Sequence, residues 1–220
     1  YTFPKPLISV CNKPMIQLVV ENLDFDCEYV FLIRKSHVEK YTGFIDTLDR
    51  ITNGKFKYII VDSLTEGAAC TALLAEEFIN NDEDLLIANS DQYIEYQAPN
   101  FNMLKNQTNC DAIVYTFNAV HPKWSFVKTN ARGFITEVAE KKPISNIATC
   151  GIYWYRKGSD FVKYAKQMIE KDIRVNNEFY IAPVYNELIG DNKTLIPFYV
   201  DKMWGIGTPE DLNLFLREKK

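Results

Sequence analysis

The stretch Asp84-Leu85-Leu86-Ile87-Ala88-Asn89-Ser90-Asp91 joins a short apolar run to a carboxylate. Because Leu85–Ala88 is continuously apolar, it predicts a strand that is buried on both faces. In an open α/β sheet, ligands bind in the crevice beyond the carboxyl ends of such strands. Asp91 is therefore a candidate oxygen ligand for Mg²⁺, although an isolated aspartate in this place more often simply begins a turn.

The first half of the chain alternates between the two secondary-structure periodicities. The spacing of apolar residues predicts helices over 15–23, 38–51 and 68–78, and strands over 29–33, 57–61, 85–88 and 112–117. This rhythm favours an α/β protein with a doubly wound, mostly parallel sheet. Right-handed crossovers would then bring the carboxyl ends of the strands to one edge.

The second half is more mixed in pattern. It predicts a hairpin of 124–128 with 134–139, a strand over 148–155, helices over 161–169 and 179–189, and a strand over 195–200. A last helix over 209–216 would begin with a proline and have Thr208 as its cap. Because the chain shows neither an internal repeat nor a low-complexity linker, we expect a single domain over residues 1–220.

Composition excludes several classes of protein. With 220 residues, 47% of them hydrophobic, the chain can bury a core, so disorder is excluded. A net charge of −4 gives no large basic surface for nucleic acid, and no apolar stretch approaches the roughly 20 residues that span a bilayer. Five dispersed cysteines without a CxxC pair favour a reduced, cytoplasmic protein over a zinc site.

Two segments near the start could bind phosphates. Lys5 lies between two prolines that keep it extended, and Lys13 directly precedes a helix that a proline begins. Cations near a helix N-terminus suit a triphosphate, although a lysine between prolines is more often a solvated linker. Further along, Gly67 and Ala68 leave the backbone open to a flat ligand, or allow ordinary close packing of a helix on a strand.

Two charged segments complete the candidates. In Glu137–Pro143, a lysine leaving a strand beside Glu140 could pair with a substrate phosphate, although such a charge run is usually a solvated turn. Arg174–Tyr180 places a cation, two amides and a carboxylate beside aromatic residues, which suits a small polar substrate. Its alternative interpretation is a helix cap with Glu178 in the first turn.

Taken in order, these segments resemble the family of nucleotidyltransferases that activate sugar 1-phosphates and related phosphate monoesters. The motifs are PKPL, KPMI, EGAA, NSDQ, EKKP, GIYWY, NNEFY and WGIGTPEDL, and they run from Phe3 to about Leu216. The resemblance implies a Rossmann-like mixed sheet. It also implies attack of a phosphate oxygen of the acceptor on the α-phosphorus of a nucleoside triphosphate, with release of pyrophosphate.

The resemblance also assigns roles, residue by residue. The catalytic group would be Lys5 on the phosphates, Asp91 as the Mg²⁺ ligand and Lys141 on the phosphate of the acceptor. The nucleotide-binding group would be Lys13, Gly67, Ala68 and Asn89, and the acceptor-binding group Glu140, Gly151, Asn177 and Glu178. Positioning and charge neutralisation are what phosphoryl transfer chiefly requires.

Two departures from the family pattern bear on these roles. The glycine-rich signature of the family, with its catalytic arginine, lies upstream of PKPL, and Tyr1-Thr2-Phe3 joins the pattern in mid-motif. We therefore expect that segment in the natural protein. Gly205 stands where many relatives carry a second aspartate metal ligand, which puts a sugar 1-phosphate acceptor in doubt or moves that ligand to Glu178 or Asp201.

The sequence of the second half is similar to a subgroup of this family found in bacterial capsule and surface-polysaccharide synthesis. That subgroup includes a CTP:phosphoglutamine cytidylyltransferase. We expect a cytoplasmic enzyme with CTP favoured and UTP or dTTP as alternatives, and a homo-oligomer stays open. A sugar-1-phosphate nucleotidyltransferase and a regulatory homologue without catalysis are the alternatives. A glycosyltransferase ranks lower, because Asn89-Ser90-Asp91 offers one carboxylate where that class uses an Asp-x-Asp pair.

Overall fold

The computed structural model describes residues 3–219, so Tyr1 and Thr2 of the mid-motif start lie outside the described part. Contacts between Cα atoms divide the chain into two compact units. Unit 1 comprises the chain up to Leu64, Asn89–Ala98 and the chain from Lys202, and unit 2 comprises Thr65–Ala88 and Pro99–Asp201. The expectation of a single domain stays a prediction.

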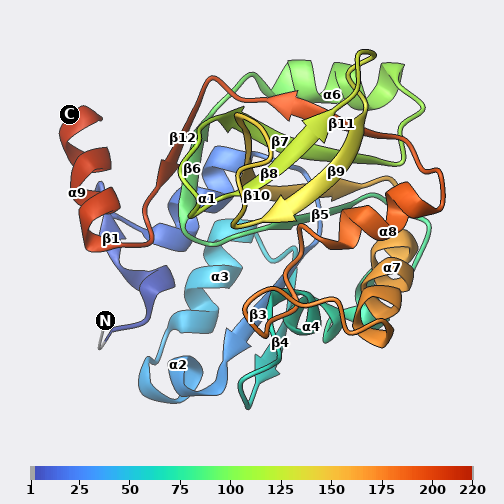
Figure 1. The fold of residues 1–220 in the computed structure, drawn as a ribbon. Coiled ribbons are helices and arrows are strands. Elements are labelled where there is room, and N and C mark those ends of the chain that lie inside the picture. Colours follow the sequence, from blue (N-terminus) through green and yellow to red (C-terminus); the bar gives the residue numbers. More distant parts are fainter. Residues whose placement is uncertain (1–2, 220) are drawn as a thin grey trace. The chain divides into compact units, whose positions relative to one another are not determined.

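Unit 2 is built on a six-stranded mixed sheet (Figure 1). Its elements are α4 (Ala68–Leu73), α5 (Glu76–Ile79), β5 (Leu85–Ala88), α6 (Ala98–Gln107, within the unit from Pro99), β7 (Ala112–Asn118), β8 (Ser125–Thr129), β9 (Ile135–Glu140), β10 (Ile147–Tyr155), α7 (Gly158–Glu170), α8 (Val184–Gly190) and β11 (Leu195–Tyr199). The strand order is β11-β7-β10-β8-β9, and β5 also pairs with β10.

Strand directions in this sheet follow from the pairings of β10. It runs antiparallel to β5, β7 and β8, while β11 is parallel to β7 and β9 is antiparallel to β8. Therefore β5, β7, β8 and β11 share one direction, and β9 and β10 run against them. The short connection between β8 and β9 explains why β9 reverses against β8, because a parallel crossover needs a dozen or more residues. The predicted mixed α/β, Rossmann-like class is confirmed.

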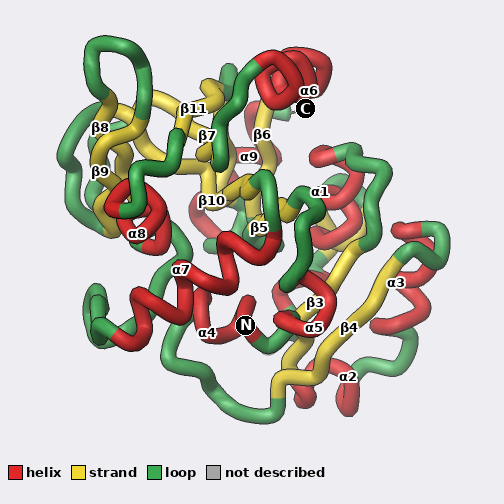
Figure 2. The backbone as a smooth tube through the Cα atoms, turned by 90° about the vertical axis from the view of Figure 1, so that its right-hand side faces the viewer, coloured by secondary structure: helices red, strands yellow, loops and turns green. Residues whose placement is uncertain are grey.

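Side chains of β10 alternate between two covered faces of the sheet. Trp154 packs edge-on against Phe101 of α6, with the ring centroids 6.3 Å apart. Its neighbour Tyr155 stacks on Tyr185 of α8 at 4.8 Å and contacts Phe161 of α7 at 5.4 Å. Because successive residues of a strand point to opposite faces, helices cover both sides of the sheet (Figures 1 and 2), which is the doubly wound arrangement.

Unit 1 combines three small strand pairs with helices. Its elements are the 3₁₀ turn η1 (Lys5–Leu7), β1 (Ser9–Val10), β2 (Lys13–Pro14), α1 (Met15–Leu23), β3 (Tyr29–Arg34), α2 (Lys35–Lys40), α3 (Phe44–Thr52), β4 (Phe56–Val61), β6 (Gln92–Glu95), β12 (Lys202–Gly205) and α9 (Pro209–Glu218). Strands β3 and β4 are parallel neighbours (Figure 2), and β6 and β12 are antiparallel. The core between α1, β3 and α3 contains Ile16, Val20, Ile33, Phe44 and Leu48.

Three predicted helices have different bounds from those expected. The helix predicted over 38–51 is interrupted between α2 and α3, where Gly43 adopts a left-handed conformation with φ 85°. The helix over 68–78 divides into α4 and α5, because Leu74 N and Ala75 N bond carbonyls three residues back and tighten the turn. The helix over 179–189 begins at Val184.

Other predicted elements agree with the structure or are corrected by it. The hairpin of β8 with β9 and the cap of α9, where Asp211 N donates to the Thr208 hydroxyl, are confirmed. Strand β5 forms as predicted but is half-buried and has an exposed Ala88, so full burial on both faces was wrong. The sequence did not predict α6 or the pairing of β6 with β12. Within residues 3–219, no helix is long and apolar enough to span a membrane.

Candidate functional site

Lys5 and Asp91 form an ion pair in unit 1. Lys5 begins η1, and Asp91 lies in the connection between β5 and β6, where the sequence predicted it. The distance from Lys5 Nζ to Asp91 Oδ2 is 3.1 Å, although 86 positions separate the two residues. Their side chains are 40% and 31% exposed, so both charges remain accessible to a ligand.

Two glycines lie against carboxylates at the end of β12. A Cβ atom on Gly207 would collide with Asp91 Oδ2 and lie 2.9 Å from its Cγ. A Cβ atom on Gly205 would lie 3.3 Å from Asp211 Oδ2. The sequence has Gly205 where a second acidic residue is expected, and the structure brings the carboxylate of Asp211 beside it. Sequence reasoning missed this residue because GTPED reads as a helix cap.

The two other predicted nucleotide-binding residues of unit 1 differ in their surroundings. Lys13 Nζ donates to Glu21 Oε2 at 2.6 Å on the exposed face of α1. The hydrogen bond from Lys13 is the main reason that the pKa of the Glu21 carboxyl is lowered. Asn89 is exposed and directly follows β5. Both roles stay predictions.

Gly67 in unit 2 lies against the backbone of Phe179. Gly67 has φ 135°, and a Cβ atom there would lie 2.5 Å from Phe179 N and O. Phe179 N donates to Glu66 O at 2.8 Å, and Ala69 N donates to Phe179 O at 2.9 Å. The glycine is therefore needed for close packing of these two loops, which was one of the two interpretations of the segment, and Ala68 remains exposed beside it.

Arg174 reinforces the same junction. Its Nη2 atom lies 2.7 Å from Glu66 Oε2, and its guanidinium carbon lies 4.0 Å from the centroid of the Phe179 ring. Its Nη1 atom donates to the carbonyl of Asn177 at 3.3 Å. The loop that carries the predicted acceptor residues Asn177 and Glu178 is thus tied to the loop that carries Gly67.

Glu140 ends β9 and is hydrogen-bonded to Ser125 of β8. Ser125 Oγ donates to Glu140 Oε2 in a short hydrogen bond. Burial raises the pKa of the Glu140 carboxyl, the bond from Ser125 and the charge of Lys141 lower it, and the charge of Glu178 raises it. Glu140 is therefore a partly desolvated carboxyl group with one oxygen held by the sheet.

Lys141, Tyr180 and Glu178 form a series of polar contacts. Lys141 follows β9 in a left-handed conformation with φ 53°, and its Nζ atom donates to the Tyr180 hydroxyl at 2.5 Å. This hydrogen bond is the main reason that the pKa of Lys141 is raised. Burial raises the pKa of the Tyr180 phenol, the bond from Lys141 lowers it, and the contact with Glu178 raises it. Tyr180 was not assigned a role from the sequence, although it stands two residues after Glu178.

Gly151 is buried in the middle of β10 and has φ 73°. The register between β10 and β7 shifts between Thr149 and Tyr153, so the glycine forms a bulge.

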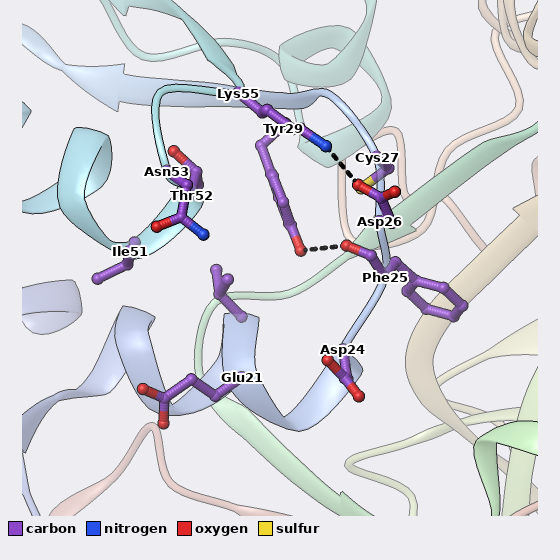
Figure 3. A pocket seen from close by; sticks show the side chains of 11 residues that line it. Glu21, Asp24, Phe25, Asp26, Cys27, Tyr29, Ile51, Thr52, Asn53 and Lys55 are labelled. Carbon is purple, nitrogen blue, oxygen red and sulfur yellow. Dashed lines mark hydrogen bonds and ion pairs between the residues drawn. The ribbon is translucent and has the colours of Figure 1, made fainter.

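A hollow of about 210 Å³ lies in unit 1, between the ends of α1 and α3 (Figure 3). None of the predicted site residues lines it, and its Lys55 is paired with Asp26 at 2.6 Å.

Comparison with known proteins identifies the family. The profile of the nucleotidyl transferase family matches residues 1–214. The bifunctional protein GlmU of Methanocaldococcus jannaschii is 24% identical over 223 residues, which is 98% of this chain and 50% of that protein. The chain therefore belongs to the nucleotidyl transferase family, and it spans about half the length of this curated relative.

Solved structures share the fold. A nucleoside-diphosphate-sugar pyrophosphorylase from Vibrio cholerae RC9 superimposes with a TM-score of 0.80 at 20% identity, over 99% of this chain and 93% of that one. A UDP-glucose pyrophosphorylase complexed with UDP-glucose gives a TM-score of 0.77 at 20% identity, over 98% and 91% of the two chains. The fold is that of nucleotide-diphospho-sugar transferases.

Proposed function

We propose that this protein transfers a nucleoside monophosphate from a nucleoside triphosphate to a small phosphorylated acceptor. An oxygen of the acceptor phosphate attacks the α-phosphorus and forms a new P–O bond. The bond from the α-phosphorus to the oxygen that bridges it to the β-phosphorus breaks, and pyrophosphate leaves with its electron pair. The accessible ion pair of Lys5 and Asp91 is the observation that carries the proposal, together with the match of the family.

In unit 1, Lys5 would neutralise the charge that develops on the phosphate oxygens. A lysine is a compact point charge, and preorganised charge is the main source of rate in phosphoryl transfer. Asp91 orients Lys5 at 3.1 Å before substrate binds. Lys13 and Asn89 would assist at the nucleotide, with Lys13 first exchanging its exposed partner Glu21 for a phosphate.

The donor set in unit 1 fits Mg²⁺. Magnesium usually binds to one or two carboxylates, with water and substrate phosphates completing its coordination, so a cage of protein ligands is not required. Asp91 supplies one carboxylate, and Asp211 brings a second beside Gly205. Among residues 3–219, no group of three or more His, Cys, Asp and Glu side chains gathers as a metal cage. When bound, the ion would neutralise charge on the triphosphate and the leaving pyrophosphate.

In unit 2, Gly67 and Ala68 would contact the base, and four residues would contact the acceptor. Lys141 would pair with the acceptor phosphate, and its bond to Tyr180 limits the rotamers it can occupy before binding. Glu140 and Glu178 would accept hydrogen bonds from the rest of the acceptor. Asn177 and Gly151 would shape the same surface.

Two classes of acceptor are candidates. The names of the relatives favour a sugar 1-phosphate, and the wording of the second half of the sequence favours CTP with phosphoglutamine. The three-residue series Lys141, Tyr180 and Glu178 combines a cation with a carboxylate, which suits an acceptor that carries a phosphate and a hydrogen-bond donor. Both candidates have these groups, so both belong in the test.

The experiment is a panel that couples pyrophosphate release to a colorimetric readout. ATP, CTP, GTP, UTP and dTTP are each combined with glucose 1-phosphate, phosphocholine and phosphoglutamine, with and without Mg²⁺. We expect release with one preferred pair, only when Mg²⁺ is present. Binding of nucleotide without release in any pair would favour the regulatory homologue. In a separate incubation with a nucleotide sugar, release of a nucleoside diphosphate would favour a glycosyltransferase.

A further inference from the structure

Ser125 and Glu140 face each other across two antiparallel strands. They are directly opposed in the register of β8 with β9, and Ser125 Oγ donates to Glu140 Oε2. Ser125 is 7% exposed. Because directly opposed residues lie on one face of a sheet, the pairing itself brings the two side chains together.

Two further hydroxyl groups stand behind Ser125. The hydroxyl of Tyr153 on β10 lies 3.1 Å from Thr149 Oγ1. Burial raises the pKa of the Tyr153 phenol, and its contacts with Thr149 and Ser125 lower it. Residues four apart in a regular strand are separated by about 13 Å. The bulge at Gly151, with φ 73°, brings Thr149 and Tyr153 within reach of each other. Gly151 therefore has a structural role, because its bulge brings these two hydroxyl groups together.

The proton positions in this network follow from the chemistry of its end. An ionised Glu140 has only acceptors, so Ser125 must donate its single proton to it. Ser125 then has no second proton to offer to Tyr153. A hydrogen bond in so buried a setting is stronger than the same bond in water.

We propose that Ser125 is a positioning residue that holds Oε2 of Glu140, so that Oε1 is presented to a hydroxyl or N–H group of the acceptor outside its phosphate. Tyr153 and Thr149 support Ser125 from behind. This inference rests on the proposed function and deepens its acceptor half. Without the bond from Ser125, the carboxylate rotates, and the acceptor loses an oriented partner while the nucleotide loses nothing.

The test separates the KM of the acceptor from the KM of the nucleotide in three variants at one position. Ser125→Ala removes the hydroxyl, Ser125→Cys keeps a similar shape with a weak donor, and Ser125→Thr keeps the hydroxyl. We expect Ala and Cys to raise the acceptor KM about tenfold and Thr to restore most of it. The nucleotide KM should stay within about twofold in all three.

Ser145→Ala is the matched control. Ser145, in the connection between β9 and β10, donates through its Oγ to Val127 O of β8 at 2.6 Å, so this change removes a hydroxyl bonded to the same strand without touching Glu140. We expect a lower melting temperature and an unchanged acceptor KM. Tyr153→Phe, which keeps the ring, should raise the acceptor KM by a smaller factor than Ser125→Ala, and it serves as the test if the Ser125 variants do not fold.

The outcomes are distinguishable. A wild-type protein that is silent over the whole panel overturns the proposed function and this inference with it. An active wild type whose acceptor KM does not move in Ser125→Cys and Tyr153→Phe overturns this inference alone. Equal increases in the KM of both substrates, or the same increase in Ser145→Ala, also overturn it, because a general loss of structure would then explain the effect.

Discussion

Asp91 and Glu140 are the two carboxylates on which the proposed chemistry relies, and the protein holds them differently. Asp91 lies in a connection, is 31% exposed in its side chain and pairs with a lysine 86 positions away. Glu140 ends a strand, is bonded to the residue that faces it, and has its pKa raised by burial. An accessible carboxylate suits a metal ion, and a desolvated one suits recognition of an uncharged donor.

The largest expected effect is at Asp91. Asp91→Asn keeps the shape of the side chain and removes its charge, so Mg²⁺-dependent kcat should fall by about 10²–10³-fold, the usual loss for one preorganised electrostatic group. The measurement is pyrophosphate release over a titration of Mg²⁺. Asp62→Asn is the control, because Asp62 is an exposed carboxylate that pairs with Lys35 at 3.3 Å. Unchanged activity in Asp91→Asn would remove Asp91 from the mechanism.

Gly207→Ala tests the position of the Asp91 carboxylate without altering a charge. The new Cβ atom would lie 2.9 Å from Asp91 Cγ and 3.2 Å from its Cβ, so the carboxylate must move. A small displacement of a positioned group can reduce turnover by about ten- to hundredfold. The control is Gly190→Ala, where a Cβ atom meets nothing within 4 Å. Equal kcat values for the two variants would contradict the role of Asp91 geometry.

Lys141→Gln tests the acceptor side. Loss of the ammonium should raise the acceptor KM about ten- to hundredfold, because a charged hydrogen bond contributes roughly 1.5–3 kcal/mol. The nucleotide KM should change little. The neighbouring exposed Lys142 provides the control Lys142→Gln. A larger effect on the nucleotide than on the acceptor would reverse the assignment.

Glu140→Gln tests the partly buried carboxyl group through the pH dependence of stability. Because burial raises the pKa of Glu140 above its ordinary 4.5, the folded protein binds this proton more tightly than the unfolded chain. Stability therefore falls as pH rises from 4.5 through the raised value, and Gln removes that loss. Chemical unfolding from pH 4 to pH 8 should show the variant gaining relative to wild type as pH rises. A constant difference would contradict the sign of the shift.

Lys13→Gln should have the smallest effect. Its partner Glu21 is exposed, and surface ion pairs contribute about 0–1 kcal/mol, so the stability change should be close to the error of a thermal melt. If Lys13 assists at the nucleotide, the nucleotide KM should rise by a few fold. An unchanged nucleotide KM would confine Lys13 to its surface pair.

The sequence predicted local features well and contacts between distant segments poorly. Strand β5, the hairpin of β8 with β9 and the cap of α9 follow from apolar spacing and turn chemistry. The break at Gly43 was missed, because the apolar periodicity continues across it. Lys5 and Asp91 were each named as candidates, but their pairing across 86 positions leaves no local trace.

The residues that the sequence missed are recognised only from their contacts in the structure. Ser125 reaches Glu140 through strand register, and Tyr153 reaches Thr149 across a bulge, neither of which composition reveals. Tyr180 reads as an aromatic neighbour of Glu178 until its bond to Lys141 is seen. Asp211 has the sequence pattern of an ordinary first turn of a helix, which it also is.

The most direct test of the central claim is phosphorus NMR of the wild-type reaction with the preferred pair and Mg²⁺. Nucleotidyl transfer predicts that the acceptor phosphomonoester signal gives way to two coupled signals of a new diphosphate ester, with one equivalent of free pyrophosphate. A triphosphate that yields nucleoside diphosphate and orthophosphate, with the acceptor signal intact, would contradict it.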